Sequence, residues 1–164
     1  MLLAFAWGAG VTPARHHELG KVAHHTESVI HLHAQAVFVA FSDVTGLDEK
    51  TALMLSSSFG GGMGRMREVC GAVSGMFMVA GQLYGYASPT DNDTKKEHYA
   101  LIQRMAAKFR EENGSIICRE LLGIESDGAT PTKRTDEFYK KRPCVELVKT
   151  CAEIMDEIIA EKGL

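Results

Sequence analysis

A glycine-rich elbow followed by a cysteine is the feature that most constrains the fold of this chain. Four of the five residues from Gly60 to Gly64 are glycine, and Cys70 follows shortly after. Glycine adopts positive-φ backbone conformations that other residues reach only at a cost. Beyond the elbow, apolar residues recur at helical spacing from Val69 to Tyr84. The sequence therefore predicts a tight loop that places Cys70 at or near the first turn of a helix.

Helical periodicity extends over most of the chain after residue 33. Gly46, Gly114 and Gly123 are predicted to end helices, and Asp48 is predicted to cap one. No segment alternates apolar and polar residues convincingly enough to predict a strand. We expect an all-α fold, a compact bundle of about five to six helices with no significant sheet. The predicted helices cover about residues 34–46, 49–56, 70–84, 94–113, 116–122 and 143–159.

The composition limits the class of protein. A chain of 164 residues with a formal net charge of −3 is long enough for one domain and gives no support for nucleic-acid binding. No stretch approaches the roughly 20 apolar residues that a membrane span needs. Four cysteines in this length do not make a disulfide scaffold. These features predict a cytoplasmic protein whose thiols are free, metal-bound or redox-active.

The first 32 residues differ from the rest. Six of the seven histidines fall between His16 and His33, and glycines interrupt any helix before about Lys21. His17, His24 and His31 recur every seven residues, but no recognised metal-ligand spacing surrounds them. We therefore expect residues 1–32 to be a divergent, poorly ordered leader and residues 33–164 to be a single helical domain. A polar, basic segment from 125 to 141, with a helical turn near Phe138, is predicted to be an exposed connection.

Three cysteines share a predicted position in a first helical turn: Cys70, Cys118 and Cys144. The partial positive charge at a helix N-terminus favours the thiolate and lowers a thiol pKa. Arg65 and Arg67 are near enough in sequence to add to that field. If these helix ends converge, the three thiols form one reactive site. The alternative is that each cysteine is simply a buried packing residue.

Cys151 fits that packing alternative best, because it lies in mid-helix on an apolar stripe. The glycines have a second interpretation as well. The elbow does not match a phosphate-binding loop, since no Lys-Ser or Lys-Thr follows it. Gly71 and Gly75 are four residues apart, so they are predicted to let another helix approach closely. Gly71, directly after Cys70, is counted among the residues that support the site.

Together these segments resemble one known family. Phe59–Arg65, Cys70-Gly71-Ala72-Val73-Ser74-Gly75, Cys118 within 114–123 and Cys144 before a helix are similar to the C_GCAxxG_C_C family of small redox-active prokaryotic proteins. The resemblance implies a helical domain whose motif cysteines form a redox or metal centre. It also implies an association with transporters. No Cys-x-x-Cys-His motif for covalent haem is present.

One position departs from that family pattern. The family's first cysteine lies in a motif like Asn-Cys-Ala-Gln-Ala-Val, and this chain has Leu32-His33-Ala34-Gln35-Ala36-Val37 instead. His33 can replace a thiolate as a ligand of zinc or of an iron–sulfur cluster, but it cannot form a disulfide.

Three functions follow as hypotheses. The first is thiol–disulfide or electron-transfer chemistry at Cys70, Cys118 and Cys144, as in a thiol oxidoreductase. The second is a zinc or iron–sulfur site formed by the same cysteines and His33. The third is a helical interaction module with no active site. The expected partner is a redox protein or a transporter-linked protein, and a homodimer is left open.

Overall fold

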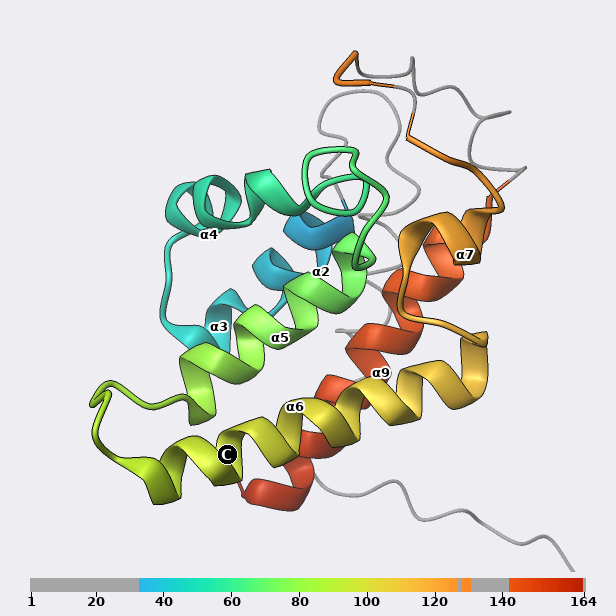
Figure 1. The fold of residues 1–164 in the computed structure, drawn as a ribbon. Helices are drawn as coiled ribbons and strands as arrows, with labels where there is room; N and C mark the ends of the chain where they lie inside the picture. The colour runs from blue at the N-terminus through green and yellow to red at the C-terminus, as the bar shows by residue number, and fades with distance from the viewer. Residues whose placement is uncertain (1–32, 127, 131–141, 164) are drawn as a thin grey trace, which may run out of the picture.

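The computed structural model describes residues 33–126, 128–130 and 142–163, and within them the fold is all-α, as predicted (Figure 1). The predictions for the histidine-rich leader and for the helical turn near Phe138 lie outside these residues. An isolated antiparallel bridge joins Val69 to Ile117. The elements are α2 (His33–Ala40), α3 (Ser42–Thr45), α4 (Glu49–Ser56), the 3-10 turn η1 (Ser57–Phe59), α5 (Gly71–Tyr84), α6 (Asn92–Asn113), α7 (Cys118–Leu122) and α9 (Cys144–Lys162).

The helix ends follow from local side-chain and glycine chemistry. The Asp48 carboxylate accepts a hydrogen bond from the Thr51 N–H at 3.0 Å, which confirms it as the N-cap of α4. Gly46 and Gly123 adopt left-handed φ values of 70° and 63° at the ends of α3 and α7. The predicted first helix is divided at Phe41 into α2 and α3.

The start of α6 differs from the prediction. Thr94 and Glu97 have the spacing of a capping box, which places the helix start near Thr94. Instead, α6 begins at Asn92, and Asp91 is its N-cap, with its carboxylate accepting from the Thr94 N–H at 3.0 Å. The sequence leaves the choice open because Asp91 and Thr94 can each cap a helix. In the structure the Asp91 carboxylate is the cap, and Thr94 is the residue that donates to it.

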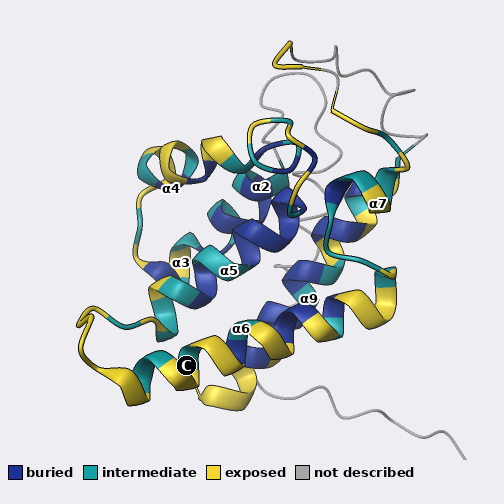
Figure 2. Ribbon diagram, in the orientation of Figure 1, coloured by how far each residue is buried: buried dark blue, intermediate teal, exposed yellow. Residues whose placement is uncertain are grey.

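The core is centred on α5, with α2 and α9 against it (Figure 2). Phe41, Met76, Phe109 and Met155 are among its largest fully buried side chains. Helices α2 and α5 approach so closely that a Cβ on Gly75 would lie 2.6 Å from the Ala34 carbonyl oxygen. The predicted close approach of a helix over Gly71 and Gly75 is therefore confirmed.

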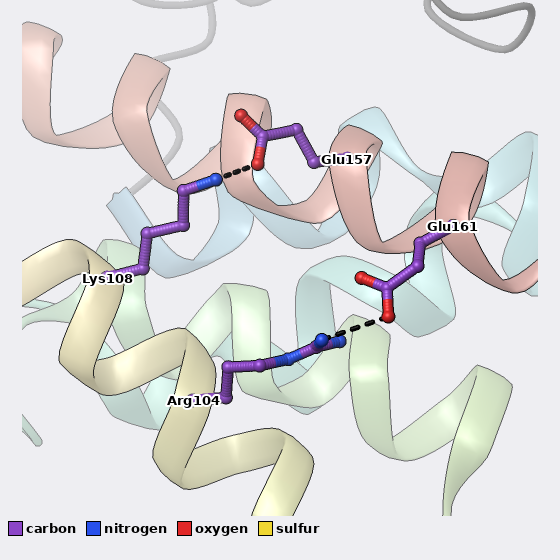
Figure 3. Close-up of polar contacts among 4 residues, drawn as sticks. All are labelled: Arg104, Lys108, Glu157 and Glu161. Carbon is purple, nitrogen blue, oxygen red and sulfur yellow. Dashed lines mark hydrogen bonds and ion pairs between the residues drawn. The ribbon is translucent and has the colours of Figure 1, made fainter.

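Helix α6 packs along α9, and two ion pairs join their exposed sides (Figure 3). Arg104 binds Glu161 at 2.9 Å, and Lys108 binds Glu157. Exposed pairs of this kind add little to stability, so the buried apolar faces hold the two helices together. No helix in the described part of the chain has the length and apolar character needed to cross a membrane.

Candidate functional site

The elbow after η1 is a loop in which most residues have a left-handed backbone conformation, and it leads to Cys70. Positive φ values occur at Gly61, Gly62, Met63, Gly64, Arg65 and Arg67. The loop closes on itself, because the Glu68 N–H donates to the Gly62 carbonyl at 3.2 Å. Cys70 then serves as the N-cap residue of α5 and is buried, with 4% of its surface exposed. The predicted position of Cys70 at the start of a helix is therefore confirmed.

The isolated bridge places Cys118 beside Cys70. The Cys70 N–H donates to the Ile116 carbonyl at 2.8 Å, and the Cys118 N–H donates to the Glu68 carbonyl at 2.6 Å. In this antiparallel pairing Cys70 lies opposite Ile116, so Cys118 is its diagonal neighbour on the same side. Diagonal neighbours have Cβ atoms within about 7 Å. Two thiols 48 positions apart in the sequence are thus brought together by backbone hydrogen bonds.

Gly62 makes this approach possible. A Cβ on Gly62 would lie 2.7 Å from the Cys118 Cβ and 3.0 Å from the Glu68 nitrogen. Such distances are far inside normal carbon contact, and φ at Gly62 is +73°. The elbow glycine therefore has a specific role, which is to leave space for the cysteine at the start of α7.

The other two cysteines are on α9. Cys144 is the first residue of that helix and is 3% exposed, whereas Cys151 lies two turns further on and is fully buried. Figure 1 shows α5, α7 and α9 beginning at the same end of the bundle. Cys151 is part of the apolar core, as predicted. The four cysteines are all free thiols.

The thiol pKa values differ from the sequence-based expectation. Burial raises the pKa of Cys70 to about 11, although the N–H groups of Ala72 and Val73 act in the opposite direction. Burial likewise raises the pKa of Cys144 to about 12, and the neighbouring Cys70 thiol adds to the increase. The helix-start effect exists, but removal of the thiols from water outweighs it. The prediction of a lowered thiol pKa was therefore wrong for Cys70 and Cys144.

The thiols also influence one another. Cys118 contributes to the raised pKa of both Cys70 and Cys144. Cys70 contributes to the raised pKa of Cys151, although burial is the main cause there. Cys70 is thus close enough to the other three cysteines to interact with them electrostatically.

The two predicted supporting arginines have different roles. Arg65 holds the segment after α7, because its Nε donates to the Gly128 carbonyl at 2.9 Å and its own carbonyl accepts from the Ser126 hydroxyl at 3.1 Å. Arg67 is buried, and its positive charge lowers the pKa of Cys144, as does that of Arg142. Arg142 and Arg67 thus act on Cys144, and the expected field of Arg65 and Arg67 on Cys70 stays a prediction.

His33 begins α2 and lies beside the start of α5, with its Cβ 3.6 Å from where a Gly71 Cβ would be. This position next to Cys70 suits a residue that occupies the place of a motif cysteine. However, the residues that the structure describes include no group of three or more His, Cys, Asp or Glu side chains arranged to hold a metal ion. The zinc or iron–sulfur site therefore stays a prediction of the sequence.

Comparison with known proteins bears on this thiol group. Residues 33–158 match a family described as "Putative redox-active protein (C_GCAxxG_C_C)". The chain belongs to this family. The match covers most of the C_GCAxxG_C_C protein and begins at His33. No curated protein and no solved structure matches it.

Sequence reasoning missed two parts of the site. The Val69–Ile117 bridge was missed because a single pair of bridged residues leaves no alternating pattern. The burial of Arg67 was missed because charged residues are rarely buried. The one available signal was its place in the short segment between the glycines and Cys70.

The raised pKa of Cys70 predicts a loss of stability at alkaline pH. The folded-state pKa of about 11 lies above the ordinary value of 9.0. The buried, protonated Cys70 thiol therefore makes its full contribution to the free energy of unfolding below pH 9, and this contribution is lost as the pH rises through 11. Urea unfolding in the presence of reductant should show the wild type losing about 2 kcal/mol more than Cys70→Ala between pH 8 and pH 10.5. Equal losses would contradict the buried, neutral thiol.

Proposed function

We propose that this C_GCAxxG_C_C protein performs thiol–disulfide redox chemistry, with Cys70 and Cys118 as the exchanging pair and Cys144 as a third, adjacent thiol. The observation that carries the proposal is the Val69–Ile117 bridge, which makes Cys70 and Cys118 diagonal neighbours. A disulfide needs Cβ atoms about 3.5–4.5 Å apart, so the pair must close by a few ångström. The glycine-rich elbow adjoining Cys70 supplies backbone freedom for this closure.

The reaction has two exchange steps with a disulfide-bearing partner. Cys70 loses its proton and attacks one partner sulfur; the partner's S–S bond breaks, a mixed disulfide forms, and the released partner sulfur takes up a proton. Cys118 loses its proton and attacks the Cys70 sulfur; the mixed S–S bond breaks, and the second partner sulfur is released as a thiol. Two electrons pass from the two cysteines to the partner, and two protons follow them.

The buried setting favours a reducing dithiol. A low thiol pKa stabilises the reduced form of a pair and makes its disulfide a strong oxidant. Burial raises the pKa of Cys70 to about 11, so the reduced form lacks this stabilisation. We therefore expect the reduced protein to donate electrons to an oxidised partner. Its reaction at neutral pH is slow until a partner opens the site, because little thiolate is present.

Mass spectrometry of the oxidised protein tests the pair. We expect oxidised glutathione to remove two hydrogens from the wild type, reversibly with reductant, and peptide mapping to join Cys70 to Cys118. The variants Cys70→Ser and Cys118→Ser should lose this bond, whereas Cys151→Ser is the matched control and should keep it.

Two outcomes would contradict the proposal. If Cys70→Ser and Cys118→Ser each still form a reversible disulfide to the same extent as the wild type, other thiols are the reacting pair. Absence of any reversible disulfide, with Cys70→Ser altering only thermal stability, would favour the interaction-module hypothesis instead.

A further inference from the structure

Helix α7 is attached to the molecule mainly through the elbow. Helices α2, α5, α6 and α9 pack on one another, whereas the five-residue helix α7 contributes little to that packing. Ile116 and Leu121 of this segment are only partly buried against the core. Gly114 ends α6 with a φ of 85° and joins that helix to the α7 segment. We call residues 115–126 the flap, with Gly114 at a helix end, where hinges commonly lie.

Backbone hydrogen bonds join the flap to the elbow beside the two thiols. Three N–H groups donate across this junction: Cys70 to the Ile116 carbonyl at 2.8 Å, Cys118 to the Glu68 carbonyl at 2.6 Å and Arg119 to the Arg67 carbonyl at 3.0 Å. The elbow also lies against Cys118, because a Cβ on Gly62 would be 2.7 Å from the Cys118 Cβ. With the junction closed, Cys70 and Cys118 are 4% and 6% exposed. A partner's disulfide therefore reaches these sulfur atoms only when the junction opens.

Side-chain contacts hold the outer side of the same junction. The Arg119 guanidinium on the flap and the Glu68 carboxylate on the elbow form an ion pair at 2.8 Å, and both side chains are partly exposed. The Ser126 hydroxyl donates to the Arg65 carbonyl at 3.1 Å near the end of the flap. An exposed ion pair adds little to global stability. Local opening has a smaller free energy than global unfolding, so the same small contribution changes the population of a locally open form appreciably.

We propose that the flap opens from the elbow to give a disulfide-bearing partner access to Cys70 and Cys118, and that the Glu68–Arg119 ion pair sets the population of the open form. This inference rests on the proposed function and adds the motion that admits the partner. The open form keeps the packing of α2, α5, α6 and α9, so Cys151, which is fully buried in that core, stays buried in it.

The test measures the alkylation of individual cysteines in the reduced full-length protein, with iodoacetamide and peptide mass spectrometry. When opening and closing are fast, the alkylation rate follows the population of the open form. We expect Glu68→Gln and Arg119→Met each to accelerate alkylation of Cys70 and Cys118 by about threefold. The Cys151 rate should stay unchanged, because only global unfolding exposes that thiol.

Two further variants serve as controls. Arg119→Lys retains the ion pair and should stay within about 1.5-fold of the wild type. Arg104→Met breaks a comparable exposed pair, the one with Glu161 at 2.9 Å between α6 and α9, and should leave the Cys70 and Cys118 rates unchanged.

The two ion-pair variants separate flap opening from a direct effect of charge on the thiols. Glu68→Gln removes a negative charge, and Arg119→Met removes a positive one. A direct effect on the thiol pKa would change the alkylation rates in opposite directions, whereas flap opening accelerates both variants. Rates that change in opposite directions, or do not change in either variant, overturn the inference. Equal acceleration of Cys151 also overturns it, since the variants would then act on global unfolding.

The two proposals fail in different ways. If the ion-pair variants expose Cys70 and Cys118 but the wild type forms no disulfide between them, only the proposed function is lost. If the disulfide forms normally and alkylation is independent of the Glu68–Arg119 pair, only this inference is lost.

Discussion

Replacing Gly75 with alanine should lower the melting temperature by about 5–10 °C, which corresponds to about 2–4 kcal/mol. The new Cβ would lie 2.6 Å from the Ala34 carbonyl oxygen and 3.1 Å from the Val37 Cβ. The obstacle is backbone rather than a flexible side-chain end, so α2 and α5 must move apart. Because α2 carries His33 at its start, beside α5, the same shift disturbs the site end of the bundle.

Gly81→Ala is the matched control for this prediction. Gly81 is on the same helix, but a Cβ there would meet nothing within 4 Å. Alanine is the better helix former, so this variant should gain up to about 1 kcal/mol. Thermal unfolding of the two variants in parallel measures the difference. A Gly75→Ala protein as stable as Gly81→Ala would contradict the close contact between α2 and α5.

Replacing Gly62 with alanine should weaken both the fold and the thiol pair. The added Cβ would lie 2.7 Å from the Cys118 Cβ, at a φ of +73° that alanine adopts only with strain. We expect a loss of about 2–4 kcal/mol and a rate of Cys70–Cys118 disulfide formation reduced by about tenfold or more. Non-reducing mass spectrometry over time, together with urea unfolding, measures both effects.

Gly64→Ala separates the steric effect from the backbone effect. Gly64 has a similar φ of +59°, but its nearest neighbour would be the Ser58 carbonyl at an ordinary 3.9 Å. This variant should lose only about 1–2 kcal/mol from strain and should form the disulfide at a rate within about twofold of the wild type. Equal disulfide rates in the two variants would show that Gly62 does not control the approach of Cys118.

The predicted positions of the three cysteines at helix starts are confirmed. They could be predicted because the start of a helix depends on residues close by in the sequence. Glycine before Cys70, Ser115 before Cys118 and Pro143 before Cys144 mark places where a helix can begin. Ser115 does accept a hydrogen bond, from the Ile117 N–H at 2.9 Å, although α7 begins only at Cys118. These signals act over a few residues, so a single sequence contains them.

The reactivity of the thiols could not be predicted in the same way. The dipole effect depends on position within a helix, which the sequence indicates, but the opposing desolvation depends on what covers the helix end. Cys70 and Cys144 are 4% and 3% exposed because packing between helices removes them from water. The direction of the pKa change was therefore decided by contacts between segments far apart in the sequence.

The sequence alone determined the helical class, the glycine elbow, the core role of Cys151 and the close approach of a helix over Gly71 and Gly75, since all of these follow from spacing and backbone preference along the chain. Only the tertiary structure decided that Cys118 is beside Cys70, that Gly62 leaves space for it, and that Arg67 is buried. The physical reason is that hydrogen bonding across a single bridge and exclusion of water are properties of the packed chain. Neither the bridge nor the exclusion of water produces a periodic pattern of residues that a sequence analysis could detect.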